Sequence, residues 1–281
     1  MNSSQLKVGR IEYLNIWPLF HSINNNLCRD ISFVSGHPAM LNQGLVRKEI
    51  HVSPSSSIEY LYRGEDYLLL ADLSISAASQ VQSVLFCLPF PFEELERYVR
   101  KNGEIFITRA SDTSRALLKI LWHYHWKLPA PRWKMLDPGQ GLSTGKPFLE
   151  IGDHALSIFL NPHQNMHVLD LAGEWHSMTG LPFVFALWIL RRDLQEEQKN
   201  ILSRLAGELL QARQKMRSEY HELCTKYPGT DFTPEQISAY WRKMDYGLEA
   251  EHKAGLVAFG RYLSDMGEIS GMPALNFFEY G

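Results

Sequence analysis

One sequence pattern recurs four times in this chain and constrains its fold more than any other feature. The pattern is a short apolar run, then a few small polar residues, then residues with helical periodicity. The apolar runs cover residues 7–14, 49–52, 104–108 and 148–151, and polar turns follow at Asn15, 53–57, 109–114 and 152–153. Each unit is typical of a β-strand that leads into a helix. Strands that alternate with helices predict an α/β fold with parallel sheets covered by helices.

Two further strand-like runs, Gln82–Leu88 and Phe183–Leu190, lie on either side of the third and fourth units. We interpret them as two strands that cross between two lobes with a cleft between them. The first lobe is then discontinuous, formed by residues 1–87 plus 188–281. The second lobe is the inserted segment 88–187.

Helix signals dominate the chain after Arg191. Apolar residues recur there at near-helical spacing among charges, and Thr233 with Gln236 has the spacing of a capping box. A last helix is expected from about Glu249 to Met266, where Gly267 ends it. Ser56 and Glu59 also have capping-box spacing, which predicts a helix start at that point.

Charge and cysteine content restrict the partners and the compartment. The 281 residues carry a formal net charge of -3, without a basic stripe, so a nucleic-acid partner is not expected. The three cysteines are odd in number and far apart, which favours a reducing compartment. The polar start lacks a signal-peptide pattern, and the longest apolar run, 181–190, is too short for a membrane span. We therefore expect a cytoplasmic protein without a membrane partner.

The polar turns are the candidate binding elements. A helix N-terminus presents unpaired N–H groups and a partial positive charge, and serine or threonine hydroxyls strengthen such an anion site. One such residue at a helix start is more often only a cap. However, Ser55–Ser57 and 111–114 carry three or four polar side chains each, more than a cap needs. Four turns around one cleft predict a site for a small dicarboxylate.

Motifs for metals and nucleotides are missing from the sequence. His163 and His167 have metal-like spacing, but Pro162 and Asn165 indicate a loop there, and no H-E-x-x-H pattern occurs. No G-x-G-x-x-G, Walker A or G-x-S-x-G motif is present either. We expect no metal site.

Several segments in order resemble the chorismate dehydratases of the futalosine-dependent menaquinone pathway. Residues 8–15 (VGRIEYLN) resemble the opening motif of that family, and 52–60 (VSPSSSIEY) its serine-rich turn. Residues 151–156 and 174–188 follow in family order. The resemblance implies a fold of the type II periplasmic-binding-protein kind. It also implies conversion of chorismate to 3-[(1-carboxyvinyl)oxy]benzoate and water, without a cofactor.

The resemblance also assigns the site residues. Asn15 is the expected catalytic residue, which orients the ring or hydrogen-bonds the departing hydroxyl. The expected substrate-binding residues are Tyr13, Ser55, Ser56, Ser57, Ser83, Thr113, Ser114, Gly152 and Asp153. Because aromatisation drives the reaction, we expect only weak acid–base assistance from the protein. A carboxylate of the substrate is one candidate base, and the proton acceptor stays unassigned. Asp153 either relays a proton or caps its helix, and we favour the cap.

Two positions depart from the family pattern, and two other functions remain open. His51 and His154 stand where the family usually has aspartate. The first alternative function is binding of a small carboxylate without catalysis, since a fold does not fix a function. The second is synthesis of 1,4-dihydroxy-6-naphthoate by the related enzyme of the same pathway. The Tyr13–Asn15 and 179–183 motifs favour the dehydratase.

Overall fold

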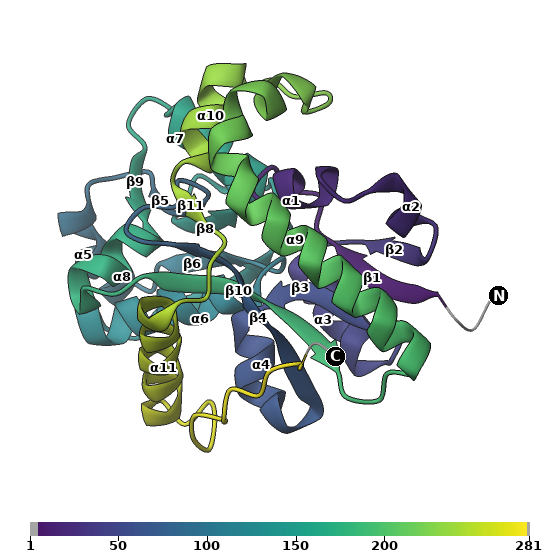
Figure 1. The fold of residues 1–281 in the computed structure, drawn as a ribbon. Coiled ribbons are helices and arrows are strands. Elements are labelled where there is room, and N and C mark those ends of the chain that lie inside the picture. The colour runs from purple at the N-terminus through teal and green to yellow at the C-terminus, as the bar shows by residue number, and fades with distance from the viewer. Residues whose placement is uncertain (1–4, 280–281) are drawn as a thin grey trace.

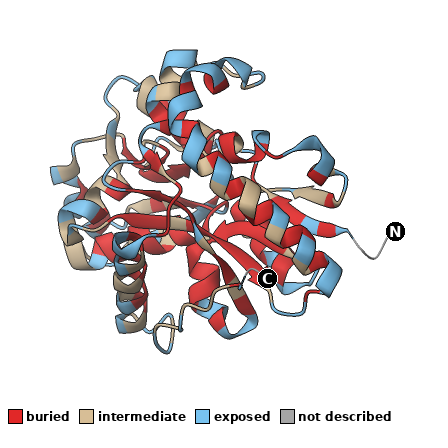
Figure 2. Ribbon diagram, in the orientation of Figure 1, coloured by how far each residue is buried: buried red, intermediate tan, exposed pale blue. Residues whose placement is uncertain are grey.

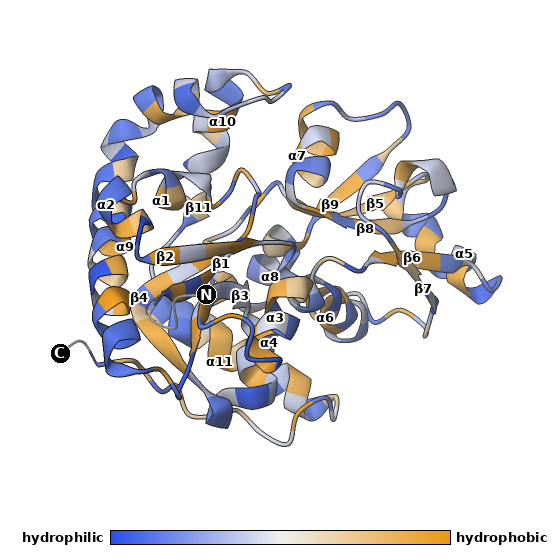
Figure 3. Ribbon diagram, turned by 90° about the vertical axis from the view of Figure 1, so that its right-hand side faces the viewer, coloured by the Kyte–Doolittle hydropathy of each residue, from blue (hydrophilic) through white to orange (hydrophobic). Residues whose placement is uncertain are grey.

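The computed structural model describes residues 5–279, which form two β-sheets with helices around them (Figure 1). The first sheet has six strands in the order β11-β4-β10-β3-β1-β2, and the second has five in the order β7-β6-β8-β5-β9. We call the part of the protein around each sheet a lobe. The two lobes lie beside each other in Figure 3.

The bounds of the strands and helices are as follows. The first sheet contains β1 (Leu6–Arg10), β2 (Ile31–Ser35), β3 (Val52–Ser56), β4 (Tyr67–Ala77), β10 (Phe183–Arg191) and β11 (Met244–Asp245). The second contains β5 (Val84–Leu88), β6 (Glu104–Thr108), β7 (Arg132–Leu136), β8 (Phe148–Ile151) and β9 (His167–Asp170). The helices are α1 (Trp17–His21), α2 (Asn25–Cys28), α3 (Pro38–Val46), α4 (Ser57–Arg63), α5 (Leu95–Arg100), α6 (Asp112–Ile120), α7 (Gly152–Leu160), α8 (Leu171–Thr179), α9 (Glu196–Leu223), α10 (Pro234–Trp241) and α11 (Ala250–Asp265).

The four predicted strand-to-helix units are present, and two differ in their limits. The third and fourth strands match β6 and β8, but the first strand ends at Arg10, before the predicted limit. The second strand was predicted at 49–52, whereas β3 runs from Val52 to Ser56 and the serines lie on it. β3 pairs with β1 and β10 and is buried at every position. Strand pairing on both sides therefore overrides the turn preference of serine and proline.

The prediction of purely parallel sheets is wrong. β1 is parallel to β2 and β3, and β6 is parallel to β7 and β8, but β10 and β5 run antiparallel to both of their neighbours. β10 follows the strands of the second lobe along the chain and inserts into the first sheet. β5 follows the strands of the first lobe and inserts into the second sheet. Each sheet thus takes in one antiparallel strand that arrives from the other lobe, and β11 adds a second antiparallel strand at the edge of the first sheet.

The points at which the chain passes from one sheet to the other can be compared with the predicted lobe limits. β5 pairs only with strands of the second sheet and β10 only with strands of the first. The chain therefore changes sheet between Ala77 and Val84 and again between Asp170 and Phe183. The lobe limits at 87/88 and 187/188 stay a prediction, since strand pairing alone does not define a domain.

The C-terminal helices agree with their sequence signals, and one capping box does not form. Thr233 and Gln236 cap α10 reciprocally, and α11 ends just before Gly267, which has φ of 73°. Ser56 is the N-cap of α4 but makes no side-chain cap hydrogen bond. Glu59 instead accepts a hydrogen bond from the Tyr67 hydroxyl, so the capping box does not form, although the predicted helix start at this point is confirmed.

The strands form the buried centre of the molecule, as the red ribbons of Figure 2 show. α9 lies across the first lobe with one buried face and one exposed face. The largest fully buried side chains include Trp175, Trp188 and Trp241. No helix in the described part of the chain is both long and apolar enough to cross a membrane.

Candidate active site

A cleft lies where the two lobes meet, and both lobes contribute to its walls. About 490 Å³ of it is free of protein atoms, a volume that includes space open to solvent. Its polar side is formed by Tyr13, Asn15, Ser56, Ser83, Ser111, Ser114 and Gly152. Its apolar side is formed by Ile11, Pro38, Ile75, Val81, Val84, Ile151, Phe185, Ala186 and Met244. This mixture of surfaces is typical of a small-molecule site.

The structure brings six of the ten predicted site residues to the cleft: Tyr13, Asn15, Ser56, Ser83, Ser114 and Gly152. The other four, Ser55, Ser57, Thr113 and Asp153, do not line it. Their direct contact with a substrate stays a prediction. Ser57, Thr113 and Asp153 instead have protein partners.

Asn15 and Ser56 carry unpaired polar atoms at the cleft. Asn15 Oδ1 and Ser56 Oγ are buried, and neither has a hydrogen-bond partner among the described residues. A buried polar atom without a partner costs roughly 1–3 kcal/mol, so such atoms are uncommon unless something else satisfies them. Because both residues line the cleft, a bound ligand is the natural partner for both.

Tyr13 forms one wall through close packing. Its ring lies against Gly152, where an added Cβ would come within 3.0 Å of the ring, and Gly152 has φ of 65°. Only glycine combines that backbone conformation with that approach. The Tyr13 hydroxyl is hydrogen-bonded to His37 Nδ1 at 2.8 Å. Burial, and then the nearby carboxylates of Asp153 and Glu150, raise the pKa of Tyr13, so its phenol stays protonated.

The N-terminus of α4 is already occupied by protein groups. The Ile58 N–H donates to Thr113 Oγ1 at 3.1 Å, and the Ser56 N–H donates to Asn42 Oδ1 at 3.2 Å. The Ser57 hydroxyl donates to the carbonyl of Val184 at 2.8 Å. Since Thr113 belongs to the second lobe and Ile58 to the first, the Ile58–Thr113 contact joins the lobes. The α4 end therefore has fewer free N–H groups for an anion than the serine-rich sequence suggests.

The N-terminus of α6 is capped locally, whereas that of α7 is not. Ser111 caps α6 by accepting the Ser114 N–H at 3.2 Å, and the two hydroxyls lie 3.0 Å apart. α7 begins without a side-chain cap, although the Gly152 N–H donates to the Ser83 carbonyl at 2.8 Å. The α7 end, with Gly152 on the cleft wall, is thus the better-placed anion site.

Ser83 is fixed from behind by the C-terminal part of the chain. The Tyr240 hydroxyl, which is buried, donates to Ser83 Oγ at 2.8 Å. A phenol that donates to Ser83 leaves the serine proton free to point into the cleft. Ser83 is therefore oriented as a donor toward a ligand.

The cleft has almost no titratable lining. Of the residues that form it in the described chain, only Tyr13 carries an ionisable side chain, and no carboxylate, imidazole, amine or guanidinium does. No group of three or more histidines, cysteines, aspartates or glutamates that could hold a metal is found in residues 5–279. The site offers hydroxyls, one amide and helix N–H groups.

The two departures from the family pattern lie outside the cleft lining. His51 precedes β3 at the end opposite Ser56, and its Nδ1 accepts the Lys7 N–H at 3.0 Å. Burial, assisted by the positive charges of Arg191 and Lys7, lowers the pKa of His51 to about 4. His154 is exposed and lies beside Gly139. His51 thus serves in this chain as an acceptor for a strand N–H.

Sequence reasoning missed several residues that build the site. Ser111 could have been selected, because it precedes the helix in the turn that was singled out. His37, Trp241 and Tyr246, which hold the Tyr13–Asn15 segment, carry no local signal because their partners are distant in sequence. The apolar wall, with Met244 and Phe185, was also not predictable from any motif.

Two mixed sheets that exchange one strand each, with a polar cleft between them, define a protein of the periplasmic-binding-protein type. Protein AF1704 from Archaeoglobus fulgidus superposes with a TM-score of 0.72 at 15% identity and covers 96% of this chain and 100% of its own. The periplasmic aliphatic sulphonate binding protein SsuA from Escherichia coli gives 0.65 at 12% identity, with coverages of 99% and 94%. At these identities the likeness shows the fold, and the predicted fold class is confirmed.

The chain belongs to the menaquinone biosynthesis family, whose sequence model matches residues 6–265. The chorismate dehydratase of Thermus thermophilus is 29% identical over 281 aligned positions, which cover 91% of this chain and 94% of that protein. The chorismate dehydratase of Campylobacter jejuni is 31% identical over 183 positions, 63% of this chain and 64% of that protein. The family suggested by the sequence motifs is thereby confirmed.

Proposed function

We propose that this protein is a chorismate dehydratase, a carbon–oxygen lyase that converts chorismate to 3-[(1-carboxyvinyl)oxy]benzoate and water in menaquinone biosynthesis. Two curated relatives with that name align along much of the chain. The observation that carries the proposal is the composition of the cleft: hydroxyls, one amide and a helix N-terminus, with no strong acid or base.

This composition suits an elimination that the substrate drives itself. The C–H bond at the ring carbon bearing the enolpyruvyl ether breaks, and its electrons form the new ring double bond. The hydroxyl leaves the neighbouring carbon, takes up a proton and departs as water. Aromatisation makes the step favourable, so the protein has to bind, orient and hydrogen-bond its substrate. With no protein base lining the cleft, a carboxylate of chorismate is the proton acceptor we propose.

Each cleft group then has a defined task. The Asn15 amide, whose oxygen has no protein partner, hydrogen-bonds the departing hydroxyl. The α7 N-terminus, together with the hydroxyls of Ser111 and Ser114, holds a substrate carboxylate. Ser83, which lies next to Gly152 at the start of α7, donates to the substrate, and the apolar residues of the cleft pack against the ring and the vinyl group. Ser56 supplies one more unpaired hydroxyl.

The place of action that we propose is the cytoplasm. The three cysteines are all free thiols, and Cys87 and Cys224 are buried. Unpaired cysteines are typical of proteins in a reducing compartment. Fractionation of cells that produce the protein, with cytoplasmic and periplasmic markers, tests this expectation.

The test of activity uses purified protein and chorismate. We expect loss of chorismate absorbance together with the enolpyruvyl benzoate product, identified by mass spectrometry. Asn15→Ala should lower kcat roughly 100-fold, the usual effect of removing one transition-state hydrogen bond. The matched control is Asn161→Ala, since Asn161 is exposed and bonds only within its own helix end.

Three results contradict the proposal or part of it. Binding of chorismate without turnover makes the protein a binding protein. Turnover of cyclic de-hypoxanthine futalosine instead makes it the 1,4-dihydroxy-6-naphthoate synthase. An Asn15→Ala protein as active as the wild type removes Asn15 from the mechanism.

A further inference from the structure

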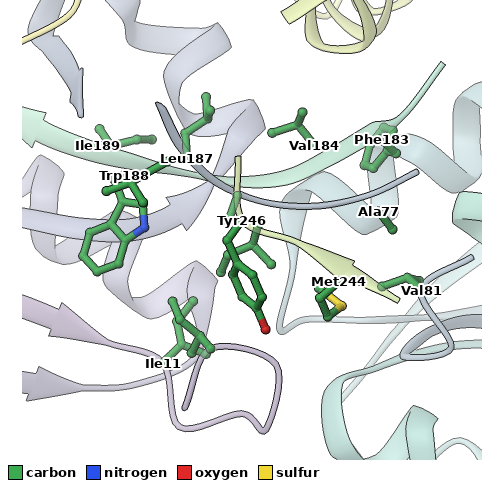
Figure 4. Close-up of a cluster of buried hydrophobic side chains, with 14 of the residues drawn as sticks. Ile11, Ala77, Val81, Phe183, Val184, Leu187, Trp188, Ile189, Met244 and Tyr246 are labelled. Carbon is green, nitrogen blue, oxygen red and sulfur yellow. The ribbon is translucent and has the colours of Figure 1, made fainter. Parts of the chain in front are cut away.

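The Tyr13–Asn15 segment is held through its backbone by three distant side chains. The Leu14 carbonyl accepts a hydrogen bond from Trp241 Nε1 at 2.8 Å, and the Asn15 carbonyl accepts one from the Tyr246 hydroxyl. The Leu14 N–H donates to Asp153 Oδ1 at 3.0 Å. Figure 4 shows the Tyr246 ring beside β10, with its hydroxyl directed toward the loop after Ile11. These three bonds fix the two peptide planes next to Leu14 and the peptide plane that follows Asn15.

Only one of the three bonds crosses the cleft. Trp241 and Tyr246 belong to the first lobe, as does the segment they hold. Asp153 is the second residue of α7, which directly follows β8 of the second sheet. The two carbonyl contacts therefore persist within one lobe, whereas the Leu14–Asp153 bond exists only while the lobes are together.

Asp153 is directed at the segment rather than at the substrate space. It does not line the cleft, and its carboxylate also interacts with the Tyr227 hydroxyl, a second group of the first lobe. Burial raises the pKa of Asp153, while the hydrogen bond from Leu14 works in the opposite direction. Both partners of this carboxylate thus come from the lobe that carries Asn15.

We propose that Asp153 is a positioning residue, which links contact between the lobes to the orientation of Asn15. The bond from the Leu14 N–H fixes the Tyr13–Leu14 peptide, and Trp241 fixes the Leu14–Asn15 peptide that follows it. Together these two peptides set the backbone that carries the Asn15 side chain. Hydrogen bonding to a leaving group tolerates only a small misplacement, so a loose segment costs rate rather than affinity. The inference rests on the proposed function in one respect, the catalytic task of Asn15.

The kinetic test compares Asp153→Asn with Asp153→Ala. Asparagine keeps an oxygen for the Leu14 N–H, and its amide suits the Tyr227 hydroxyl, which both donates and accepts. We expect Asp153→Asn to keep kcat within about 3-fold of wild type, and Asp153→Ala to lower kcat roughly 10- to 100-fold with KM changed less than about 3-fold. Asp137→Ala, at an exposed aspartate of the same lobe, is the control expected to behave as wild type.

The alternatives for Asp153 give other results. If Asp153→Asn and Asp153→Ala lose kcat equally, the proposal is overturned. Such a result indicates that Asp153 relays a proton, because a relay needs the carboxylic acid and an amide cannot replace it. A rise in KM without loss of kcat overturns it in favour of direct substrate binding. Loss of activity that tracks loss of folded protein in Asp153→Ala, with full kcat per folded molecule, shows only a structural role and also overturns it.

A measurement without substrate separates this inference from the proposed function. Amide hydrogen exchange of Leu14 should be as slow in Asp153→Asn as in wild type, and faster in Asp153→Ala at least 10-fold. Equal exchange in all three proteins overturns the cross-lobe bond. If wild type fails to convert chorismate while Leu14 responds as expected, the proposed function fails and the cross-lobe bond stands.

Discussion

At the scale of single residues, the site depends on which polar atoms the protein leaves unpaired. Asn15 and Ser56 present buried oxygens without a hydrogen-bond partner. The hydroxyls of Ser57 and Thr113 are already hydrogen-bonded to other groups of the protein. The sequence shows all four as similar helix-start residues. An oxygen that already has a partner has less to offer a ligand, so a cleft residue with an unpaired buried oxygen is the better candidate for substrate contact.

His51 gives a pH prediction at the same scale. Its neutral ring accepts the Lys7 N–H, and its folded-state pKa of about 4 lies below the ordinary histidine value of 6.5. Between those pH values the unfolded chain binds more protons, so the stability that His51 contributes is full above pH 6.5 and is lost as the pH falls toward 4. We expect a loss on the order of 1 kcal/mol, discounted because solvent screens this half-exposed side chain.

The measurement for His51 is urea unfolding from pH 7 to pH 4. His51→Asn keeps an acceptor for the strand N–H but does not titrate, so its stability should fall less over that range. Parallel pH profiles for the two proteins would show that His51 contributes nothing to the pH dependence.

At the scale of elements, helix ends determine how the lobes meet. α4 and α6 lie close together, and the N-terminus of α4 is capped by Thr113 from α6, across the lobes. α7 is the cleft helix that begins without a side-chain cap. Capping and ligand binding use the same N–H groups, so a helix end that is capped by protein is less available to a carboxylate.

Thr113→Val tests this division of tasks. Valine has nearly the same shape but leaves the Ile58 N–H unpaired and buried. We expect the free energy of unfolding to fall by about 1–2 kcal/mol, with KM for chorismate within about 2-fold of wild type. Thr113→Ser, which retains the hydroxyl, should restore stability. A tenfold rise in KM at unchanged stability would make Thr113 a substrate ligand, as the sequence predicted.

At the scale of the whole molecule, a ligand between the lobes should stabilise both. A ligand that binds only the folded protein stabilises it by about 2.7 kcal/mol at 100 times its Kd. We therefore expect chorismate to raise the Tm of the slow Asn15→Ala variant, measured by calorimetry in one cooperative transition. Benzoate, with one carboxylate, is the control and should raise Tm less at equal concentration. No shift with chorismate would show that the folded protein does not bind chorismate at that concentration.

The sequence by itself determined the class of fold, the four strand-to-helix units and the segment that carries Asn15. Those features depend on local periodicity and turn chemistry, which a short stretch of chain expresses alone. Only the tertiary structure decided that the sheets are mixed, that Trp241, Tyr246 and Asp153 hold the Asn15 segment, and which hydroxyls face the cleft. Strand pairing and hydrogen bonds between residues far apart in the chain set those outcomes, and no local pattern encodes such partners.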